Sequence, residues 1–184
     1  MTVEPLILAS RSPQRRAILE QLGIDFRVEE PEVEELASGD PRRLVAENAR
    51  RKAAAVEGHR VLGVDTTVVL DGRLFGKPTD EAEAETFLRR LSGRTHEVMS
   101  GIALRVGREE RSDVAVTRVR FRRLEPPDLA WYLASGEWRE RAGGYAIQGR
   151  GAALVEEIEG DYWNVVGLPV AALLRLAPDL LRRS

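Results

Sequence analysis

The stretch LILASRSPQRRAILEQLGIDF, residues 6–26, decides the fold of the amino-terminal part of the chain. Leu6 to Ala9 is a short apolar run, which is typical of a strand buried on both faces. Ser12 and Pro13 then provide an N-cap oxygen and a first helical residue that needs no N–H partner. The helix is expected to end at Gly23 and to bury Ala17, Ile18, Leu19 and Leu22. The alternation of Ile24, Phe26 and Val28 predicts a second strand. The order strand, turn, helix, strand indicates an α/β protein.

The first turn of this helix holds two cations, Arg15 and Arg16. The helix macrodipole is positive at this end and disfavours a cation there. Free N–H groups, the Ser10 and Ser12 hydroxyls and two guanidiniums make sense together if an anion binds to the turn. The alternative is a solvated turn in an arginine-rich chain. If an anion binds, Arg15→Ala should leave the stability of the ligand-free protein unchanged or slightly higher.

Composition sets the broad class. A chain of 184 residues is long enough for a real core, and we expect a single domain over residues 1–184, with at most an added lobe. The formal charge of −2 gives no reason to expect a nucleic acid polymer or a membrane as partner. No cysteine is present, no leader pattern is seen and no run approaches transmembrane length, so a cytoplasmic location is expected.

Only two of the 28 basic residues are lysines, Lys52 and Lys77, and the other 26 are arginines. In such a chain each lysine marks a position where an arginine does not fit. A compact ammonium suits a phosphate oxygen in a tight pocket better than a planar guanidinium does. The alternative is that both lysines are incidental surface residues.

Polar residues of the central part fall on buried patterns. A helix is expected from Asp40 to about Glu57, and Asn48 and Lys52 lie on its apolar stripe. Such groups need an acidic partner or a ligand. The next strand, Val61 to Val64, is expected to place Asp65 at its carboxyl end.

The remaining patterns predict further strands and helices. They are a hairpin of Thr67–Leu70 with Arg73–Phe75, a helix that begins with a capping box of Asp80 and Glu83 and ends at Gly93, long antiparallel strands ending at Val106 and Phe121, a helix from Pro126, a glycine-dense segment over 143–151, a strand over Ala152–Ile158 and a last helix from Pro169. We therefore expect a mixed parallel and antiparallel sheet flanked by helices.

These polar residues suggest one kind of chemistry. Cations drawn from separate elements can hold a polyphosphate whose charge no single one of them offsets. The carboxylates of Asp65 and of the pair Glu34 and Glu35 would then need a metal as bridge, and Mg²⁺ takes one or two carboxylates together with phosphate oxygens. A carboxylate beside that metal can accept a proton from an attacking water. The alternative for the glutamate pair is a solvated acidic loop.

Four stretches carry a family resemblance. They are LILASRSPQRRAILEQLGIDF, GVDTTVVLDGRLFGKP, LRRLSGRTHEVMSGIAL and AGGYAIQGRGAALVEEIEGDYWNVVGLP, and they resemble the Maf family of nucleoside triphosphate pyrophosphatases. The resemblance implies an α/β fold similar to that of the inosine triphosphate pyrophosphatases, with two lobes around a cleft, and a homodimer. It also implies hydrolysis of a nucleoside triphosphate to the monophosphate and pyrophosphate with a divalent metal, Mg²⁺ or Mn²⁺.

The resemblance also assigns roles to residues. Asp65 matches the catalytic proton acceptor, and Glu35 matches the acid paired with it at the metal, with Glu34 as the neighbouring alternative. Lys77 is assigned to the catalytic set. The substrate-binding positions are Ser10, Ser12, Gln14, Arg15, Arg16, Lys52, Thr66 and Gln148.

Two positions bear on the substrate. Thr66 and Gln148 resemble the branch that acts on dTTP and UTP, since the branch that acts on 7-methyl-GTP carries Gln and Glu there and a Trp before its paired arginines. Gln14 departs from the Ser-Pro-Arg-Arg of the dTTP/UTP branch. We therefore expect pyrimidine nucleotides first, with other or modified nucleotides as further candidates in cleaning the nucleotide pool.

Two other functions stay open at this point. One is a nucleotide-binding regulator of septum formation without turnover, because the family has been linked to cell-division arrest. The other is a nucleotidyl- or phosphotransferase that uses the same residues with an acceptor other than water.

Overall fold

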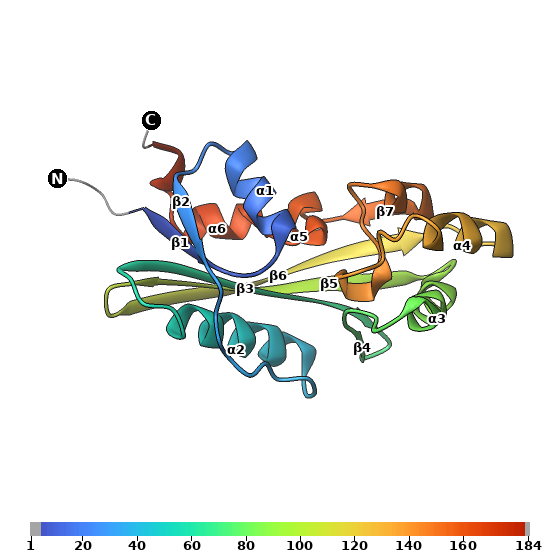
Figure 1. The fold of residues 1–184 in the computed structure, drawn as a ribbon, viewed down its shortest axis with the longest axis horizontal. Coiled ribbons are helices and arrows are strands. Elements are labelled where there is room, and N and C mark those ends of the chain that lie inside the picture. The colour runs from blue at the N-terminus through green and yellow to red at the C-terminus, as the bar shows by residue number, and fades with distance from the viewer. Residues whose placement is uncertain (1–4, 183–184) are drawn as a thin grey trace. The chain divides into compact units, whose positions relative to one another are not determined.

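The computed structural model describes residues 5–182 (Figure 1). The helices and strands, in chain order, are β1 (Leu6–Ala9), α1 (Pro13–Gln21), β2 (Phe26–Glu29), α2 (Pro41–Ala54), β3 (Arg60–Leu70), β4 (Arg73–Phe75), α3 (Glu81–Leu91), β5 (Thr95–Val106), β6 (Glu109–Phe121), α4 (Pro126–Leu133), β7 (Val155–Glu159), α5 (Tyr162–Val166) and α6 (Val170–Leu176), with short 3-10 turns η1 (Ala142–Gly144), η2 (Arg150–Leu154) and η3 (Leu180–Arg182).

The strands form one mixed sheet. Its order within the described residues is β2-β1-β3-β5-β6-β7, and β4 pairs with β3 off this path. The β1–β2 and β1–β3 pairs are parallel, whereas β3–β4 and β6–β7 are antiparallel. The predicted fold class, a mixed sheet flanked by helices, is confirmed. No helix in the described part of the chain is both long enough and apolar enough to cross a membrane.

The chain divides into two compact units. Of the described residues, 5–66, 100–115 and 167–182 form the first unit, and 67–99 and 116–166 form the second. The long strands β3, β5 and β6 each contribute residues to both units.

In the first unit, helix α2 lies directly on the sheet (Figure 1). A Cβ atom on Gly63 of β3 would lie 2.0 Å from the carbonyl oxygen of Ala49, and one on Gly101 of β5 would lie 2.0 Å from that of Val45. Only glycine permits this approach of helix and strand backbones. The side chains on this face of α2 are therefore held at short range above β3.

The predicted helix starts of this unit are confirmed. The side chain of Ser12 accepts a hydrogen bond from the backbone N–H of Arg15, Asp40 does the same for Arg43, and a proline follows each cap. Helix α1 gives way to Gly23, which has a φ of 66°. Ala17, which has its side chain in solvent, was wrongly placed on the buried face.

Three predicted boundaries in this unit are wrong. Strand β3 is continuous from Arg60 to Leu70, so Asp65 lies inside the strand and not at its carboxyl end. The Thr66-Thr67-Val68 run after Asp65 is β-branched and extends the strand through the predicted break. Helix α2 ends at Ala54, three residues before Glu57, and β2 begins at Phe26.

The second unit contains the predicted hairpin. Val68 pairs with Phe75 and Leu70 with Arg73, and the turn residues Asp71 and Gly72 have φ values of 51° and 74°. Two consecutive positive φ values are the mark of a type I′ turn, the connection that suits two twisted antiparallel strands. The core of this unit packs around Phe121 and Tyr132, both fully buried.

Two features of the second unit differ from the prediction. The Asp80 carboxylate caps helix α3, but Glu83 accepts its hydrogen bonds from Thr79, so the capping box is only half formed. Strand β7 begins at Val155, because residues 150–154 form the turn η2, and the short helix α5 after it was not predicted.

Candidate active site

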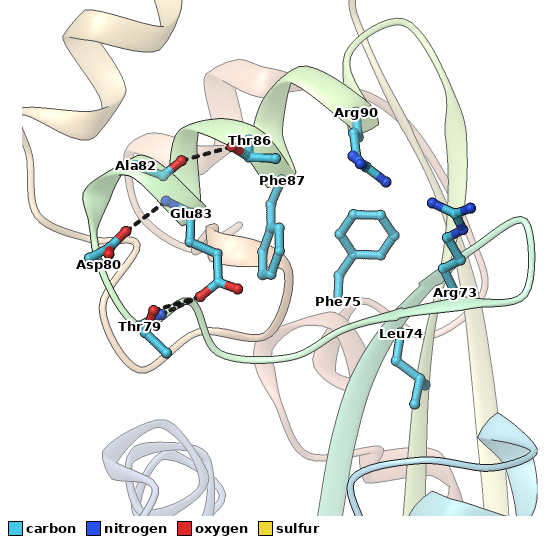
Figure 2. A pocket seen from close by; sticks show the side chains of 10 residues that line it. All are labelled: Arg73, Leu74, Phe75, Thr79, Asp80, Ala82, Glu83, Thr86, Phe87 and Arg90. Atoms are coloured by element: carbon cyan, nitrogen blue, oxygen red, sulfur yellow. Dashed lines mark hydrogen bonds between the residues drawn. The ribbon is translucent and has the colours of Figure 1, made fainter.

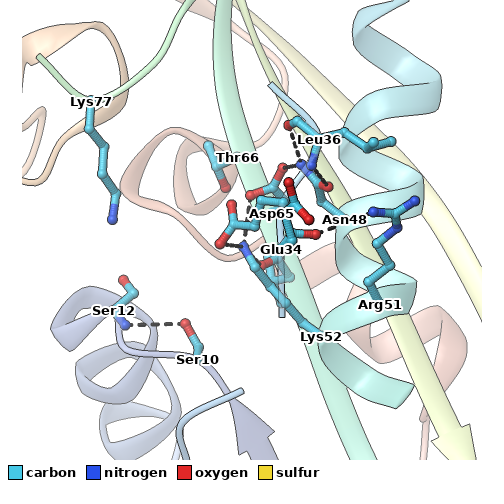
Figure 3. A network of polar contacts seen from close by, with 12 residues as sticks. Ser10, Ser12, Glu34, Leu36, Asn48, Arg51, Lys52, Asp65, Thr66 and Lys77 are labelled. Carbon is cyan, nitrogen blue, oxygen red and sulfur yellow. Dashed lines mark hydrogen bonds and ion pairs between the residues drawn. The ribbon is translucent and has the colours of Figure 1, made fainter. Parts of the chain in front are cut away.

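A carboxylate, an ammonium and an amide meet in the first unit. Lys52 and Asn48 lie four residues apart on α2, so both point from one face of the helix toward Asp65 of β3 (Figure 3). Lys52 Nζ lies 2.9 Å from Asp65 Oδ1, and Asn48 Nδ2 donates to Asp65 Oδ2 at 3.0 Å. All three residues are at most 8% exposed. Each oxygen of the buried carboxylate therefore has its own donor, which fixes its orientation.

A second carboxylate reaches the same ammonium. Lys52 Nζ lies 3.0 Å from Glu35 Oε1, and the Glu35 side chain is 52% exposed. Glu34 takes part through its backbone instead, because its carbonyl oxygen accepts from Arg51 Nη1 at 3.2 Å. Of the two neighbouring glutamates, the geometry favours Glu35 as the acid paired with Asp65.

Asn48 also fixes the loop that carries Glu35. Its Nδ2 donates to the carbonyl oxygen of Leu36 at 3.0 Å, and its Oδ1 accepts from the N–H of Leu36 at 2.7 Å (Figure 3). One buried amide thus holds the backbone beside Glu35 and one oxygen of Asp65. The predicted need of Asn48 and Lys52 for an acidic partner is met by these carboxylates.

The position of Arg15 corrects the interpretation of the first turn. The side chain is buried, and its Nε, Nη1 and Nη2 donate to Gly167 O at 2.8 Å, Ser10 Oγ at 2.9 Å and Thr66 Oγ1 at 3.1 Å. Burial lowers the pKa of Arg15, while the charges of Asp65 and Glu35 raise it. These three hydrogen bonds argue against the expectation that Arg15→Ala leaves the ligand-free protein as stable as before, because the guanidinium joins residues far apart in the chain.

The other residues of the turn are bonded to one another. Ser12 Oγ donates to Gln14 Oε1 at 2.7 Å, and the Ser12 N–H donates to Ser10 Oγ at 3.2 Å. Arg16 lies in solvent. Arg16 is thus the exposed cation of this turn, whereas Arg15 is buried and bonded to Ser10 and Thr66.

Thr66 belongs to the same network. Its hydroxyl accepts from Arg15 Nη2 and lies 2.8 Å from the Ser100 hydroxyl, which is fully buried. The residue is half-buried and directly follows Asp65 on β3.

Two predicted site residues belong to the second unit. Lys77 Nζ lies 3.0 Å from Glu140 Oε2, and both side chains are well exposed. Gln148 is exposed between buried Ile147 and half-buried Gly149. In the first unit, the structure thus joins Glu35, Lys52 and Asp65 in one cluster and Ser10, Ser12, Gln14, Arg15 and Thr66 in another, whereas Arg16 is exposed. Lys77 and Gln148 belong to the second unit.

Comparison with known proteins places the chain in a family. The family model described as "Maf-like protein" matches residues 5–180. The chain belongs to the Maf-like protein family. A dTTP/UTP pyrophosphatase of Thermus thermophilus is 50% identical over 173 residues, which cover 94% of this chain and 92% of that protein. A dTTP/UTP pyrophosphatase of Symbiobacterium thermophilum is 51% identical over 91% of this chain and 90% of that protein.

A solved structure is also similar to this Maf-like chain. The Staphylococcus aureus Ham1 protein matches with a TM-score of 0.48 and 18% identity, over 64% of this chain and 72% of that chain.

Two residues that contact the predicted site residues are not themselves among the predicted ones, Asn48 and Ser100. The i,i+4 spacing of Asn48 and Lys52 on one stripe was a usable signal for the first of them. Ser100 had no local signal, because its contact with Thr66 joins residues 34 apart in the sequence.

The carboxylates fit a divalent cation. Asp65 and Glu35 converge on one ammonium, and in residues 5–182 no third acidic, histidine or cysteine side chain joins them as a cluster. Mg²⁺ can be held by one or two carboxylates, with the other positions filled by phosphate oxygens and water. Asp65 and Glu35 would hold the metal, and a triphosphate would complete its ligands.

A pocket of about 600 Å³ also opens in the second unit, between β4 and α3 (Figure 2). Two arginines, Arg73 and Arg90, stand beside the ring of Phe75, which packs edge-on against Phe87 with ring centroids 5.1 Å apart. The residues that line this pocket include none of the predicted site residues.

Proposed function

We propose that this Maf-like chain hydrolyses nucleoside triphosphates, with dTTP and UTP as the main substrates, to the monophosphate and pyrophosphate. The observation that carries the proposal is the convergence of Asp65 and Glu35 on Lys52, with Asn48 fixing both the Asp65 carboxylate and the loop of Glu35. Curated relatives named dTTP/UTP pyrophosphatase support it, at 42–51% identity over at least nine-tenths of the chain.

Asp65 acts as the base in this proposal. Its two oxygens are oriented by Lys52 and Asn48, so the carboxylate keeps one direction when a water approaches. The water oxygen attacks the α-phosphorus, its proton passes to Asp65, and the bond to the bridging oxygen of pyrophosphate breaks. A divalent cation held by Asp65 and Glu35, Mg²⁺ or Mn²⁺, would supply charge neutralisation at the phosphate oxygens.

The remaining residues bind and select the nucleotide. Lys52 and Lys77 offer compact charges to phosphate oxygens, and Arg16 offers an exposed guanidinium. Thr66 and Gln148 are assigned to recognition of the nucleobase, and Arg15 holds the Thr66 hydroxyl in place. Gln14, which accepts from Ser12, stands where the dTTP/UTP branch has an arginine.

Pyrophosphate release from a panel of canonical and modified triphosphates tests this function. With Asp65→Asn, kcat should fall at least about 10²-fold, the usual scale for a lost general base, while the fold survives. Glu35→Gln should also lower kcat, and the neighbouring Glu34→Gln is the matched control with kcat close to wild type. Near wild-type turnover by Asp65→Asn would contradict the assigned mechanism.

The same panel separates the alternatives. Binding of a triphosphate without release of pyrophosphate would indicate a nucleotide-binding regulator. Release of pyrophosphate with the nucleotide transferred to an acceptor, and no free monophosphate, would indicate a transferase.

A further inference from the structure

The exposed side chain of Gln148 is carried by a segment that is hydrogen-bonded on one side to helix α4 and on the other to the turn that follows this helix. On one side, the N–H of Ala146 donates to the hydroxyl of Tyr132 at 2.9 Å. On the other, the N–H of Arg150 donates to both carboxylate oxygens of Glu137, at 3.1 and 2.8 Å. Gln148 lies between these two attachments.

The second attachment depends on a glycine. A Cβ atom on Gly149 would lie 2.6 and 2.7 Å from the two carboxylate oxygens of Glu137, closer than real Cβ atoms approach. The missing side chain at 149 thus makes room for the carboxylate against the backbone. A hydrogen bond from a backbone N–H to a carboxylate is charge-assisted and stronger than one between neutral groups.

Glu137 is itself held in position. Its N–H donates to Ser135 Oγ at 3.1 Å, and that hydroxyl donates to the carbonyl oxygen of Tyr132 at 2.6 Å. Tyr132 is fully buried, and Trp138, which follows Glu137 in the chain, is 6% exposed. The Glu137 carboxylate therefore extends from a buried anchor to the glycine-dense segment, where it accepts a hydrogen bond from the N–H of Arg150.

We infer that Glu137 is a positioning residue for Gln148 and so sets the discrimination between nucleotide bases. The inference rests on the proposed function, because it takes Gln148 as a residue that contacts the base. Glu137 touches the backbone on the far side of Gly149 and acts through Gln148. Its loss should change which base is accepted more than how fast a bound triphosphate is cleaved.

The test compares wild type with Glu137→Gln, Glu137→Ala and Gly149→Ala. The measurements are KM and kcat for UTP and CTP. We expect the ratio of kcat/KM for UTP to that for CTP to fall about tenfold with Glu137→Ala and less with Glu137→Gln, which keeps an acceptor for Arg150. Gly149→Ala keeps the Glu137 carboxylate but displaces it from the Arg150 N–H, so it should lower the UTP-to-CTP ratio as Glu137→Ala does. Values of kcat for UTP should stay within about threefold of wild type.

A double-mutant cycle shows whether Glu137 acts through Gln148. If it does, Glu137→Ala combined with Gln148→Ala should discriminate no worse than Gln148→Ala alone. The control is Glu156→Gln, an exposed glutamate of β7, which should leave the ratio unchanged. The inference would be overturned if the double variant lowered the UTP-to-CTP ratio by the full product of the two single effects. It would also be overturned if Glu137→Ala left this ratio unchanged.

Amide hydrogen exchange separates this inference from the proposed function. Exchange at the Arg150 N–H should be at least about tenfold faster in Glu137→Ala than in wild type, whatever the enzyme turns over. Absence of pyrophosphate release by wild type would refute the proposed function, whereas unchanged exchange at Arg150 would refute the positioning role by itself.

Discussion

Replacing Arg15 with alanine should destabilise the ligand-free protein, although first-turn cations of helices usually contribute little. The Arg15 side chain is 8% exposed, and its three donor nitrogens bond Gly167, Ser10 and Thr66. These acceptors lie at the end of β1, within β3 and before α6, all in the first unit. Alanine would remove all three hydrogen bonds and the packing of the side-chain stem.

The size of the effect follows from these contacts. A hydrogen bond from a charged donor contributes about 1.5–3 kcal/mol, but the sum for three overstates the loss. Removing a buried cation also relieves its desolvation, and Ser10 Oγ and Thr66 Oγ1 keep second partners in the Ser12 N–H and the Ser100 hydroxyl. We therefore expect the free energy of unfolding to fall by about 2–4 kcal/mol, which lowers Tm by about 4–15 °C.

Urea unfolding of the ligand-free chain measures the loss of unfolding free energy in Arg15→Ala, with Arg16→Ala as the matched control. Arg16 lies in the same turn but in solvent, so its removal should be neutral or stabilising by up to about 0.5 kcal/mol. An Arg15→Ala protein as stable as wild type, with an unchanged m value, would refute the structural role. Arg15 would then be the free first-turn cation that the sequence pattern suggested.

Three further predictions concern other residues. Burial lowers the pKa of His96 from 6.5 to about 4. Its contribution to stability is therefore fully present above pH 6.5 and is lost as pH falls toward 4. Urea titrations across this pH range should show the free energy of unfolding falling by about 3 kcal/mol more in wild type than in His96→Gln. Asn48→Ala removes the three hydrogen bonds of a buried amide, so it should destabilise the chain by about 2–4 kcal/mol and speed amide exchange at Leu36. Lys77→Arg should keep the stability of wild type within about 0.5 kcal/mol, since the pair with Glu140 is exposed, yet impair turnover because a planar fork replaces a point charge.

Local structure was largely predictable from the sequence. Ser12 and Asp40 cap their helices as expected, and Asp71 with Gly72 forms the predicted hairpin turn. Each of these features depends on residues within about four positions of one another, so caps, turn residues and periodicity suffice. The stripe that joins Asn48 and Lys52 was visible for the same reason.

Tertiary contacts decided the roles of the site residues. The same first-turn position suits an anion-binding Arg15 or a structural one, and the choice came from Gly167, 152 residues away in the chain. Likewise, Glu35 and not Glu34 meets Lys52 because Asn48 holds the backbone of Leu36. A sequence pattern indicates that a buried polar group needs a hydrogen-bond partner. It does not identify the partner, because the partner is supplied by segments that are distant in sequence and become neighbours only in the folded chain.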